Sequence, residues 1–103
     1  MRERQIFVYM LLCSDGSYYV GLTTAGIDQR FWEHQCGRFR GYTYSRRPVT
    51  LAWSEEFLTL DGAIACERRI KGWRREKKAA LARGDWAAFL SRTAKRHPST
   101  SSG

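Results

Sequence analysis

The stretch that decides the fold lies near the N-terminus, where residues 6–13 (IFVYMLLC) and 17–23 (SYYVGLT) flank the tripeptide SDG at 14–16. Both flanking runs are rich in residues that favour strands. Serine, aspartate and glycine between them are typical turn residues. The stretch therefore predicts a two-stranded β-hairpin.

The length of the turn decides whether Tyr9 and Tyr19 share a face of this hairpin. A two-residue turn at 15–16 would place them on opposite faces, because a shift of one residue reverses every side chain. A three-residue loop at 14–16 instead pairs Tyr9 with Gly21 and Leu11 with Tyr19. Such loops typically end in a left-handed residue, and Gly16 stands at that position. We therefore predict the register that brings both hydroxyls to one surface.

The chain has 103 residues, of which 43% are hydrophobic and 14% are aromatic. These values indicate one folded domain with a core of modest size. The longest apolar run, residues 6–13, is far too short to span a bilayer. The charged N-terminus does not lead into a signal-peptide pattern, so we expect a cytoplasmic protein without a membrane partner.

The three cysteines, Cys13, Cys36 and Cys66, are widely spaced. The odd count argues against a disulfide framework, and the lack of a C-x-x-C motif argues against a zinc site. His34 and Cys36 alone are too sparse a pair for a metal site. We expect packed or free thiols.

The net charge of +8 and the pI near 9.9 point to polyanionic partners. Residues 38–48 hold four arginines and three aromatic residues, with no acidic residue. Basic side chains neutralise phosphates, and aromatic and guanidinium planes offer stacking surfaces. We interpret the segment as a nucleic-acid-binding loop, with a merely solvated charged loop as the alternative. Its candidate contact residues are Arg38, Arg40, Tyr42, Arg46 and Arg47.

A helix is predicted over residues 27–36, where Ile27, Arg30, Phe31 and His34 fall on one stripe. Gly37 then supplies a stop signal. Two polar side chains share the stripe with two apolar ones. They belong either to the rim of a site or to the boundary of an ordinary amphipathic helix.

Residues 49–57 alternate in a way that predicts a third strand, with one apolar face running from Val49 to Trp53. A helix over residues 63–73 follows, and Thr59 or Asp61 is the candidate N-cap. Its predicted buried stripe consists of Ala63, Cys66, Ile70 and Trp73.

Glu67 lies within this apolar stripe. A carboxylate there is costly unless it is paired, hydrogen-bonded or bound to a metal ion. The residues alone favour a structural salt bridge, with Arg30 as a candidate partner, over a metal ligand. Lys71 and Arg74 point largely elsewhere, and we count them as candidate phosphate contacts.

The last part of the chain predicts a short helix over residues 79–83, ended by Gly84, and a further helix capped by Asp85. The spacing of Trp86, Phe89 and Leu90 predicts that this last helix packs on the core. Residues 95–103 are basic and then Ser/Thr-rich, which is typical of a flexible tail. We therefore expect a domain over residues 1–94 and a tail over 95–103.

The order of these features resembles the small, stand-alone bacterial proteins of the GIY-YIG nuclease superfamily, over about residues 6–83. The resemblance rests on Val8-Tyr9-Met10, Tyr19-Val20-Gly21, Thr23-Thr24, Arg30, Glu33-His34, Tyr42-Thr43, Arg46-Arg47-Pro48, Ser54-Glu55-Glu56-Phe57, Ala63, Glu67 and Ile70-Lys71-Gly72-Trp73. Phe7 stands where the first motif of the family has its glycine. The implied fold is α+β, a small three-stranded antiparallel sheet flanked by helices.

The resemblance also implies a catalytic site. One divalent ion, Mg²⁺ or Mn²⁺, would be held by Glu67, which reverses the preference for a simple salt bridge. Tyr9, and after it Tyr19, would help to activate the attacking water, although a tyrosine with a pKa near 10 is a poor base at neutral pH. Arg30 would contact the phosphate, and His34 would relay a proton or contact the phosphate.

The resulting hypothesis is a divalent-metal-dependent endonuclease that hydrolyses phosphodiester bonds of DNA, with a structure-selective role linked to repair. DNA is favoured over RNA as the partner. Two alternatives stay open: a nucleic-acid-binding module without catalysis, and a subunit that is active only within a larger complex. The sequence leaves the oligomeric state undefined.

Overall fold

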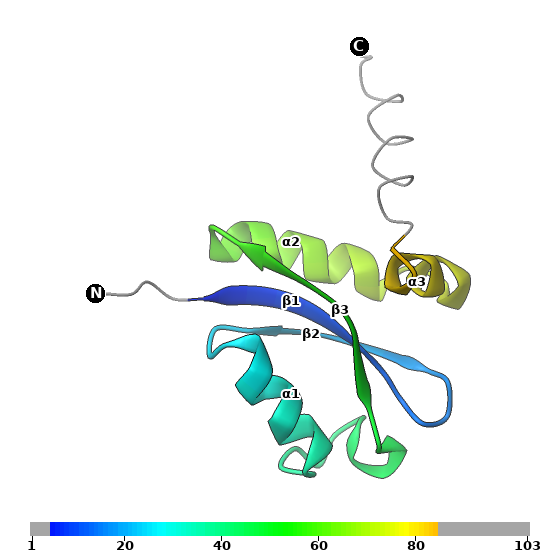
Figure 1. Ribbon diagram of the computed structural model, residues 1–103. Helices are drawn as coiled ribbons and strands as arrows, with labels where there is room; N and C mark the ends of the chain where they lie inside the picture. The colour runs from blue at the N-terminus through cyan, green and yellow to red at the C-terminus, as the bar shows by residue number, and fades with distance from the viewer. Residues whose placement is uncertain (1–4, 85–103) are drawn as a thin grey trace.

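The computed structural model describes residues 5–84. Its elements are β1 (Ile6–Leu12), β2 (Tyr18–Thr23), α1 (Ile27–Gln35), the 3-10 helix η1 (Tyr44–Arg46), β3 (Thr50–Phe57), α2 (Leu60–Lys71) and α3 (Arg75–Ala82) (Figure 1). The strands form one antiparallel sheet in the order β2-β1-β3. The predicted α+β class with a three-stranded sheet is thus confirmed. The helix expected from Asp85 onward and the expected tail lie outside the described residues.

The hairpin has the predicted register. Tyr9 pairs with Gly21, and Leu11 pairs with Tyr19. The turn is the three-residue loop, because the amide of Cys13 donates to the carbonyl of Ser17 at 2.8 Å. Gly16 ends the loop with φ of 85°, a conformation that glycine adopts without strain.

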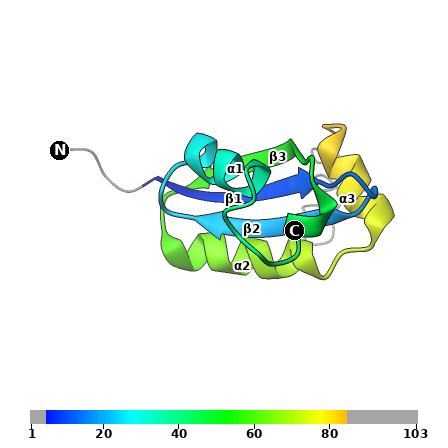
Figure 2. The same cartoon turned by 90° about the horizontal axis from the view of Figure 1, so that it is seen from below.

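The two faces of the sheet carry two separate apolar clusters. α2 and α3 cover one face, and α1 covers the other, as Figures 1 and 2 show. The cluster under α2 and α3 contains Ile6, Val8, Met10, Val20, Ala63, Ile70 and Leu81. The cluster under α1 contains Tyr9, Leu11, Cys13 and Val49, with Tyr19, Ile27 and Phe31 packed against it. Both tyrosines of the hairpin therefore face α1.

The prediction that Val49 and Trp53 share one apolar face of the third strand is wrong. The pairing of β1 with β3 shifts between Met10 and Leu11, so that Ala52 is an extra residue in β3. Such a bulge reverses the alternation of the strand. Val49 consequently lies in the cluster under α1, whereas Trp53 packs against the cluster under α2 and α3.

The predicted helix over residues 27–36 agrees with α1, whereas α2 begins and ends before the predicted 63–73 and α3 begins at Arg75 rather than at residue 79. α1 ends at Gln35, two residues before Gly37, and Thr59 caps α2 by accepting a hydrogen bond from the Gly62 amide at 3.1 Å. The segment between α1 and β3 is a loop apart from η1. The three cysteines are free thiols, as expected. Among residues 5–84, no helix combines the length and the apolar character needed to cross a bilayer.

Candidate active site

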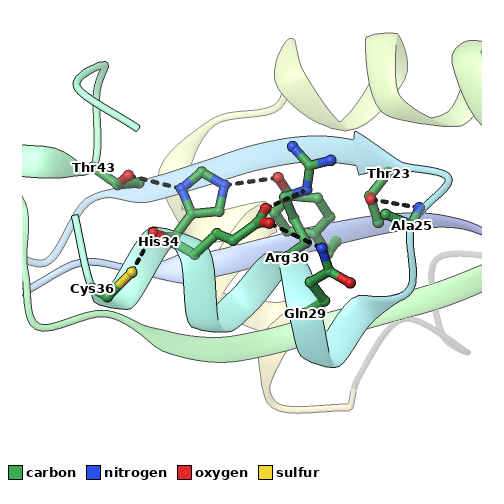
Figure 3. A network of polar contacts seen from close by, with 9 residues as sticks. Thr23, Ala25, Gln29, Arg30, His34, Cys36 and Thr43 are labelled. Atoms are coloured by element: carbon green, nitrogen blue, oxygen red, sulfur yellow. Dashed lines mark hydrogen bonds and ion pairs between the residues drawn. The ribbon is translucent and has the colours of Figure 1, made fainter. Parts of the chain in front are cut away.

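Four of the five predicted catalytic residues line one cleft of about 350 Å³. Tyr9 comes from β1, Tyr19 from β2, and Arg30 and His34 come from successive turns of α1. The loop after α1 closes the opposite wall, and Figure 3 shows His34 between Thr43 of this loop and Arg30. The complete lining is Tyr9, Tyr19, Leu22, Arg30, His34, Phe39, Arg40, Gly41, Tyr42 and Thr43.

The Tyr9 side chain is held in place by the backbone of the neighbouring strand. Tyr9 is only 2% exposed, and its ring lies over Gly21, its partner across the ladder. A Cβ at Gly21 would lie 2.5 Å from the Tyr9 hydroxyl oxygen and 3.0 Å from Cε2 of Tyr19. The glycine of the second motif thus provides the space in which the two tyrosines meet, with ring centroids 6.3 Å apart.

A line of hydrogen bonds runs through the imidazole of His34. The Tyr9 hydroxyl lies 2.9 Å from Nε2. On the other side of the ring, the Thr43 hydroxyl lies 2.8 Å from Nδ1 (Figure 3). All three side chains are buried. A neutral imidazole has one donor and one acceptor nitrogen, so this geometry fits a neutral His34 with a hydroxyl on each side.

The surroundings of both groups favour their neutral forms. Burial, followed by the electrostatic effect of Tyr19, raises the pKa of Tyr9, while the Arg30 guanidinium opposes this increase. Burial and the same guanidinium lower the pKa of His34 below its ordinary value of 6.5. In the absence of substrate, Tyr9 is therefore a phenol and His34 an uncharged imidazole at neutral pH.

Arg30 reaches the cleft from a partly buried position. Its Nε lies 3.6 Å from Oε1 of Glu33, and Gln29 donates to the other carboxylate oxygen of Glu33 at 3.1 Å. Within residues 5–84, Nε of Arg30 is buried without a hydrogen-bond partner. The guanidinium also lies 5.0 Å from the ring centroid of Phe39. An oriented cation with unused donors in a cleft suits an oxyanion such as a phosphate.

Aromatic rings form most of the remaining cleft wall. Tyr42 stacks on Tyr19 with centroids 6.0 Å apart and an interplanar angle of 27°. The His34 ring lies 5.1 Å from Tyr19 and 4.9 Å from Phe39. Tyr42 is 41% exposed, so the aromatic wall continues to the mouth of the cleft.

The predicted basic residues of the loop divide into two kinds. Arg46 and Arg47 support the loop itself: Arg46 pairs with Asp15 at 3.0 Å and stacks over Tyr42, and Arg47 donates to the carbonyl of Tyr44 at 2.8 Å. Arg38 and Arg40 are exposed. Arg40 also lines the cleft and lies over the Tyr44 ring. The remaining two candidates, Lys71 and Arg74, are exposed residues of α2 and of the turn after it.

Glu67 lies outside this cleft. It belongs to α2, on the other face of the sheet, and its carboxylate pairs with Lys71 at 2.9 Å. The expected ion pair with Arg30 is wrong, because the sheet separates the two helices and Arg30 pairs with Glu33 instead. The hydrogen bond with Glu67 raises the pKa of Lys71, and Tyr19 adds to this effect. α2, which carries the Glu67–Lys71 pair, lies along the edge strand β2 in Figure 2.

The donor groups fit a divalent ion shared with a substrate rather than one held by the protein alone. Within residues 5–84, no three His, Cys, Asp or Glu side chains cluster in a way that would hold a metal ion. Mg²⁺ needs no such cluster, since it commonly binds one or two carboxylates, several waters and substrate phosphates. Glu67, which is 18% exposed, supplies one such carboxylate, with Lys71 as its present partner.

Three residues that shape the site had no predicted role in it. Thr43 bonds His34, Glu33 pairs with Arg30, and Phe39 contacts both His34 and Arg30. Glu33 stands three residues after Arg30, a helical spacing that would have indicated the pair. Thr43 and Phe39 lie in an irregular loop, where spacing gives no such signal.

Comparisons with known proteins agree with this architecture. The GIY-YIG catalytic domain family matches residues 5–80. A UPF0213 protein of Haloquadratum walsbyi is 43% identical over 76 residues, covering 74% of this chain and 84% of the relative. A UPF0213 protein of Bacillus pumilus is 40% identical over 78 residues, covering 76% of this chain and 79% of the relative.

Two solved structures have the same fold. The solution NMR structure of a UPF0213 protein from Bacillus halodurans has a TM-score of 0.52 and 32% identity, covering 87% of this chain and 95% of that one. An NMR structure of a protein from E. faecalis has a TM-score of 0.55 and 34% identity, covering 81% and 88%. Family membership suggests nuclease activity and a nucleic-acid substrate, while the names of these relatives state neither. The chain belongs to the GIY-YIG catalytic domain family, and its relatives are small UPF0213 proteins.

Proposed function

We propose that this protein is a divalent-metal-dependent endonuclease that hydrolyses phosphodiester bonds in DNA. The observation that supports this most directly is the single cleft in which Tyr9, Tyr19, Arg30 and His34 meet. Two phenols, an imidazole and a guanidinium with free donors supply proton-accepting groups and an anion contact side by side.

Arg30 binds the scissile phosphate in this proposal. Its guanidinium already points into the cleft, and its buried Nε has no hydrogen-bond partner among residues 5–84. The negative charge of a phosphoryl group increases as water attacks, so a fixed cation at this position stabilises the transition state more than the ground state.

Tyr9 accepts the proton of the attacking water, with Tyr19 beside it. The raised pKa of Tyr9 means that the phenolate is scarce in the free protein. Any additional positive charge brought in with the substrate would lower that pKa and increase the phenolate fraction. The tyrosine would then become a base only when the complex is assembled.

Glu67 is the residue that would hold the metal ion, Mg²⁺ or Mn²⁺. When bound, such an ion polarises a phosphoryl oxygen and neutralises charge on the phosphate. Because Glu67 and the cleft lie on opposite sides of the sheet, the substrate backbone would pass over the edge of β2, the strand that carries Tyr19.

The basic loop contacts the DNA backbone on either side of the cleaved bond. Arg38 and Arg40 are exposed and would contact phosphates, as would the exposed Lys71 and Arg74. Backbone contacts position a nucleic acid without reading its sequence. We therefore propose recognition of DNA structure, in keeping with a role in repair, and a cytoplasmic location.

Cleavage assays test the proposal. Branched, single-stranded and duplex DNA are incubated with the purified protein and Mg²⁺ or Mn²⁺, with a chelator as the metal-free control. We expect metal-dependent cleavage that Glu67→Gln reduces by at least about 100-fold. The matched control Glu56→Gln changes an exposed carboxylate on the far edge strand and should retain the activity. Equal cleavage by wild type and Glu67→Gln would reject the role of Glu67.

The pairing of Glu67 with Lys71 supports a second candidate, a nucleic-acid-binding module without catalysis. This candidate predicts salt-dependent binding that survives both Glu67→Gln and Tyr9→Phe, with no cleavage of any substrate. Cleavage by wild type that Tyr9→Phe abolishes would exclude it.

A further inference from the structure

The side-chain hydroxyl of Thr43 is buried and makes one hydrogen bond among residues 5–84. Its side chain is 1% exposed, and within residues 5–84 the only hydrogen-bond partner of its hydroxyl is Nδ1 of His34, at 2.8 Å. The loop fixes its position, because the carbonyl of Thr43 accepts a hydrogen bond from the Arg46 amide at 3.1 Å. The backbone of the loop therefore holds the Thr43 hydroxyl against the imidazole of His34.

The hydrogen-bonded line from Tyr9 through His34 to Thr43 carries one proton more than its hydrogen bonds use. Two hydroxyls and a neutral imidazole carry three protons, whereas the two hydrogen bonds use two. One hydroxyl proton must point elsewhere. If Nδ1 carried the imidazole proton, Thr43 would accept, and its own buried proton would be left without an acceptor, which is costly.

The Tyr9 end of the line has another place for a proton. Tyr9 lines the cleft, and hydrogen bonding to the neighbouring Tyr19 contributes to the raised pKa of Tyr9. With the imidazole proton on Nε2, the Thr43 hydroxyl donates to Nδ1 and Nε2 donates to the Tyr9 oxygen. The Tyr9 proton then points into the cleft that Tyr9 lines, so neither His34 nor Thr43 keeps a buried proton without an acceptor.

We infer that Thr43 is a positioning residue that holds His34 in the Nε2–H tautomer, so that His34 donates a hydrogen bond to the oxygen of Tyr9. His34 then stabilises negative charge on that oxygen and does not take up the tyrosine proton. Of the two roles that family resemblance implies for His34, relay or phosphate contact, this arrangement supports neither in the free protein.

The effect of Thr43 on the cleavage rate rests on the proposed nuclease function, whereas the tautomer of His34 does not depend on that function. A hydrogen bond donated to the Tyr9 oxygen favours the phenolate, the form that accepts a proton from water. Losing the Thr43 hydroxyl would weaken that preference while leaving Tyr9, Arg30 and His34 in place.

Imidazole ¹⁵N NMR of the full-length protein above pH 7 tests the tautomer directly, because protonated and unprotonated ring nitrogens have well-separated shifts. The chain has two histidines, so His34→Gln assigns the signals. We expect an unprotonated Nδ1 and a protonated Nε2 in wild type and also in Tyr9→Phe, because Thr43 sets the tautomer. A protonated Nδ1 in wild type, or its appearance in Tyr9→Phe, would overturn the inference.

Two variants of Thr43 extend the test to activity. Thr43→Ser keeps the hydroxyl and should keep the Nε2–H tautomer and most of the cleavage rate. Thr43→Val removes it and should give mixed tautomers and a cleavage rate lower by roughly tenfold to a hundredfold. Wild-type rates in Thr43→Val, with the tautomer unchanged, would contradict the proposal. If wild type cleaves no DNA, the proposed function fails while the NMR result still decides the tautomer.

Discussion

Gly21 carries no side chain, and the ring of Tyr9 fills the space where one would lie. We expect Gly21→Ala to destabilise the protein by about 1–3 kcal/mol, because the added methyl overpacks a rigid site. It should also reduce cleavage by displacing the Tyr9 hydroxyl from His34. Denaturant unfolding and cleavage rates measure the two effects.

Gly72→Ala is the matched control for this substitution. Gly72 has ordinary helical angles, and an added Cβ would approach nothing closer than 3.6 Å. Its free energy of unfolding should stay within about 0.5 kcal/mol of wild type. Equal effects of the two substitutions would show that the close packing over Gly21 does not matter.

His34 should make the stability of the fold dependent on pH. Its pKa is lowered in the folded protein, so the unfolded chain binds a proton first as the pH falls. The free energy of unfolding should therefore be unaffected by this group above its ordinary pKa of 6.5 and decrease below it. Urea unfolding between about pH 5 and 8 in wild type and His34→Gln checks this. The slope below pH 6.5 should be shallower in the variant, and equal slopes would refute the assignment.

The family resemblance supplied the four cleft residues that were predicted, and spacing could place them because they lie in regular elements. Register arithmetic placed Tyr9 and Tyr19 on one face, and helical spacing placed Arg30 beside His34. Thr43 was not predictable in this way, since its contact with His34 depends on the path of an irregular loop. The partner of Glu67 was mispredicted for a related reason: helical spacing does not state which face of a sheet a helix covers.

At the scale of elements, the loop between α1 and β3 combines support and binding in one segment. Arg47 donates to the Tyr44 carbonyl and stacks on the Tyr44 ring, 4.5 Å from its centroid. Arg38 is exposed. We expect Arg38→Ala to weaken DNA binding and to reduce the slope of log affinity against log salt by about 0.7–0.9, with unchanged stability.

Arg47→Ala should instead lower the melting temperature, because it removes a contact on which the loop depends. Fluorescence-anisotropy titrations at several salt concentrations and thermal unfolding separate the two effects. Stability losses of the same size in both variants would contradict this division of labour.

The path of β3 was the part of the sheet that could not be predicted at the scale of elements. The three strands followed from the alternation of residues and the turn, and the fold class followed from the family resemblance, but neither the strand order nor the bulge at Ala52 was predicted. Residues 49–57 alternate without interruption, so nothing in the sequence marks the position where one residue is skipped. The bulge places Val49 in the cluster under α1 and Trp53 against the cluster under α2 and α3, although regular alternation would put both on one face.

For the whole molecule, the net charge of +8 should govern the rate of encounter with nucleic acid. We expect the association rate constant for an oligonucleotide to fall steeply between about 50 and 200 mM salt, while dissociation changes less. Stopped-flow anisotropy measures both constants. A salt effect confined to dissociation would contradict electrostatic steering.

The open edge of β2 has a consequence for handling the protein. Within residues 5–84, β2 pairs with β1 alone, and Tyr18–Thr23 contains no charged residue. Uncharged edge strands are sites of edge-to-edge aggregation, which charge repulsion between copies of a basic protein opposes. High salt, the usual means of stripping nucleic acid during purification, shortens the range of that repulsion from about 10 Å at 0.1 M to about 3 Å at 1 M. Preparations cleaned in this way should therefore be the ones most prone to self-association, and bound oligonucleotide should keep them dispersed.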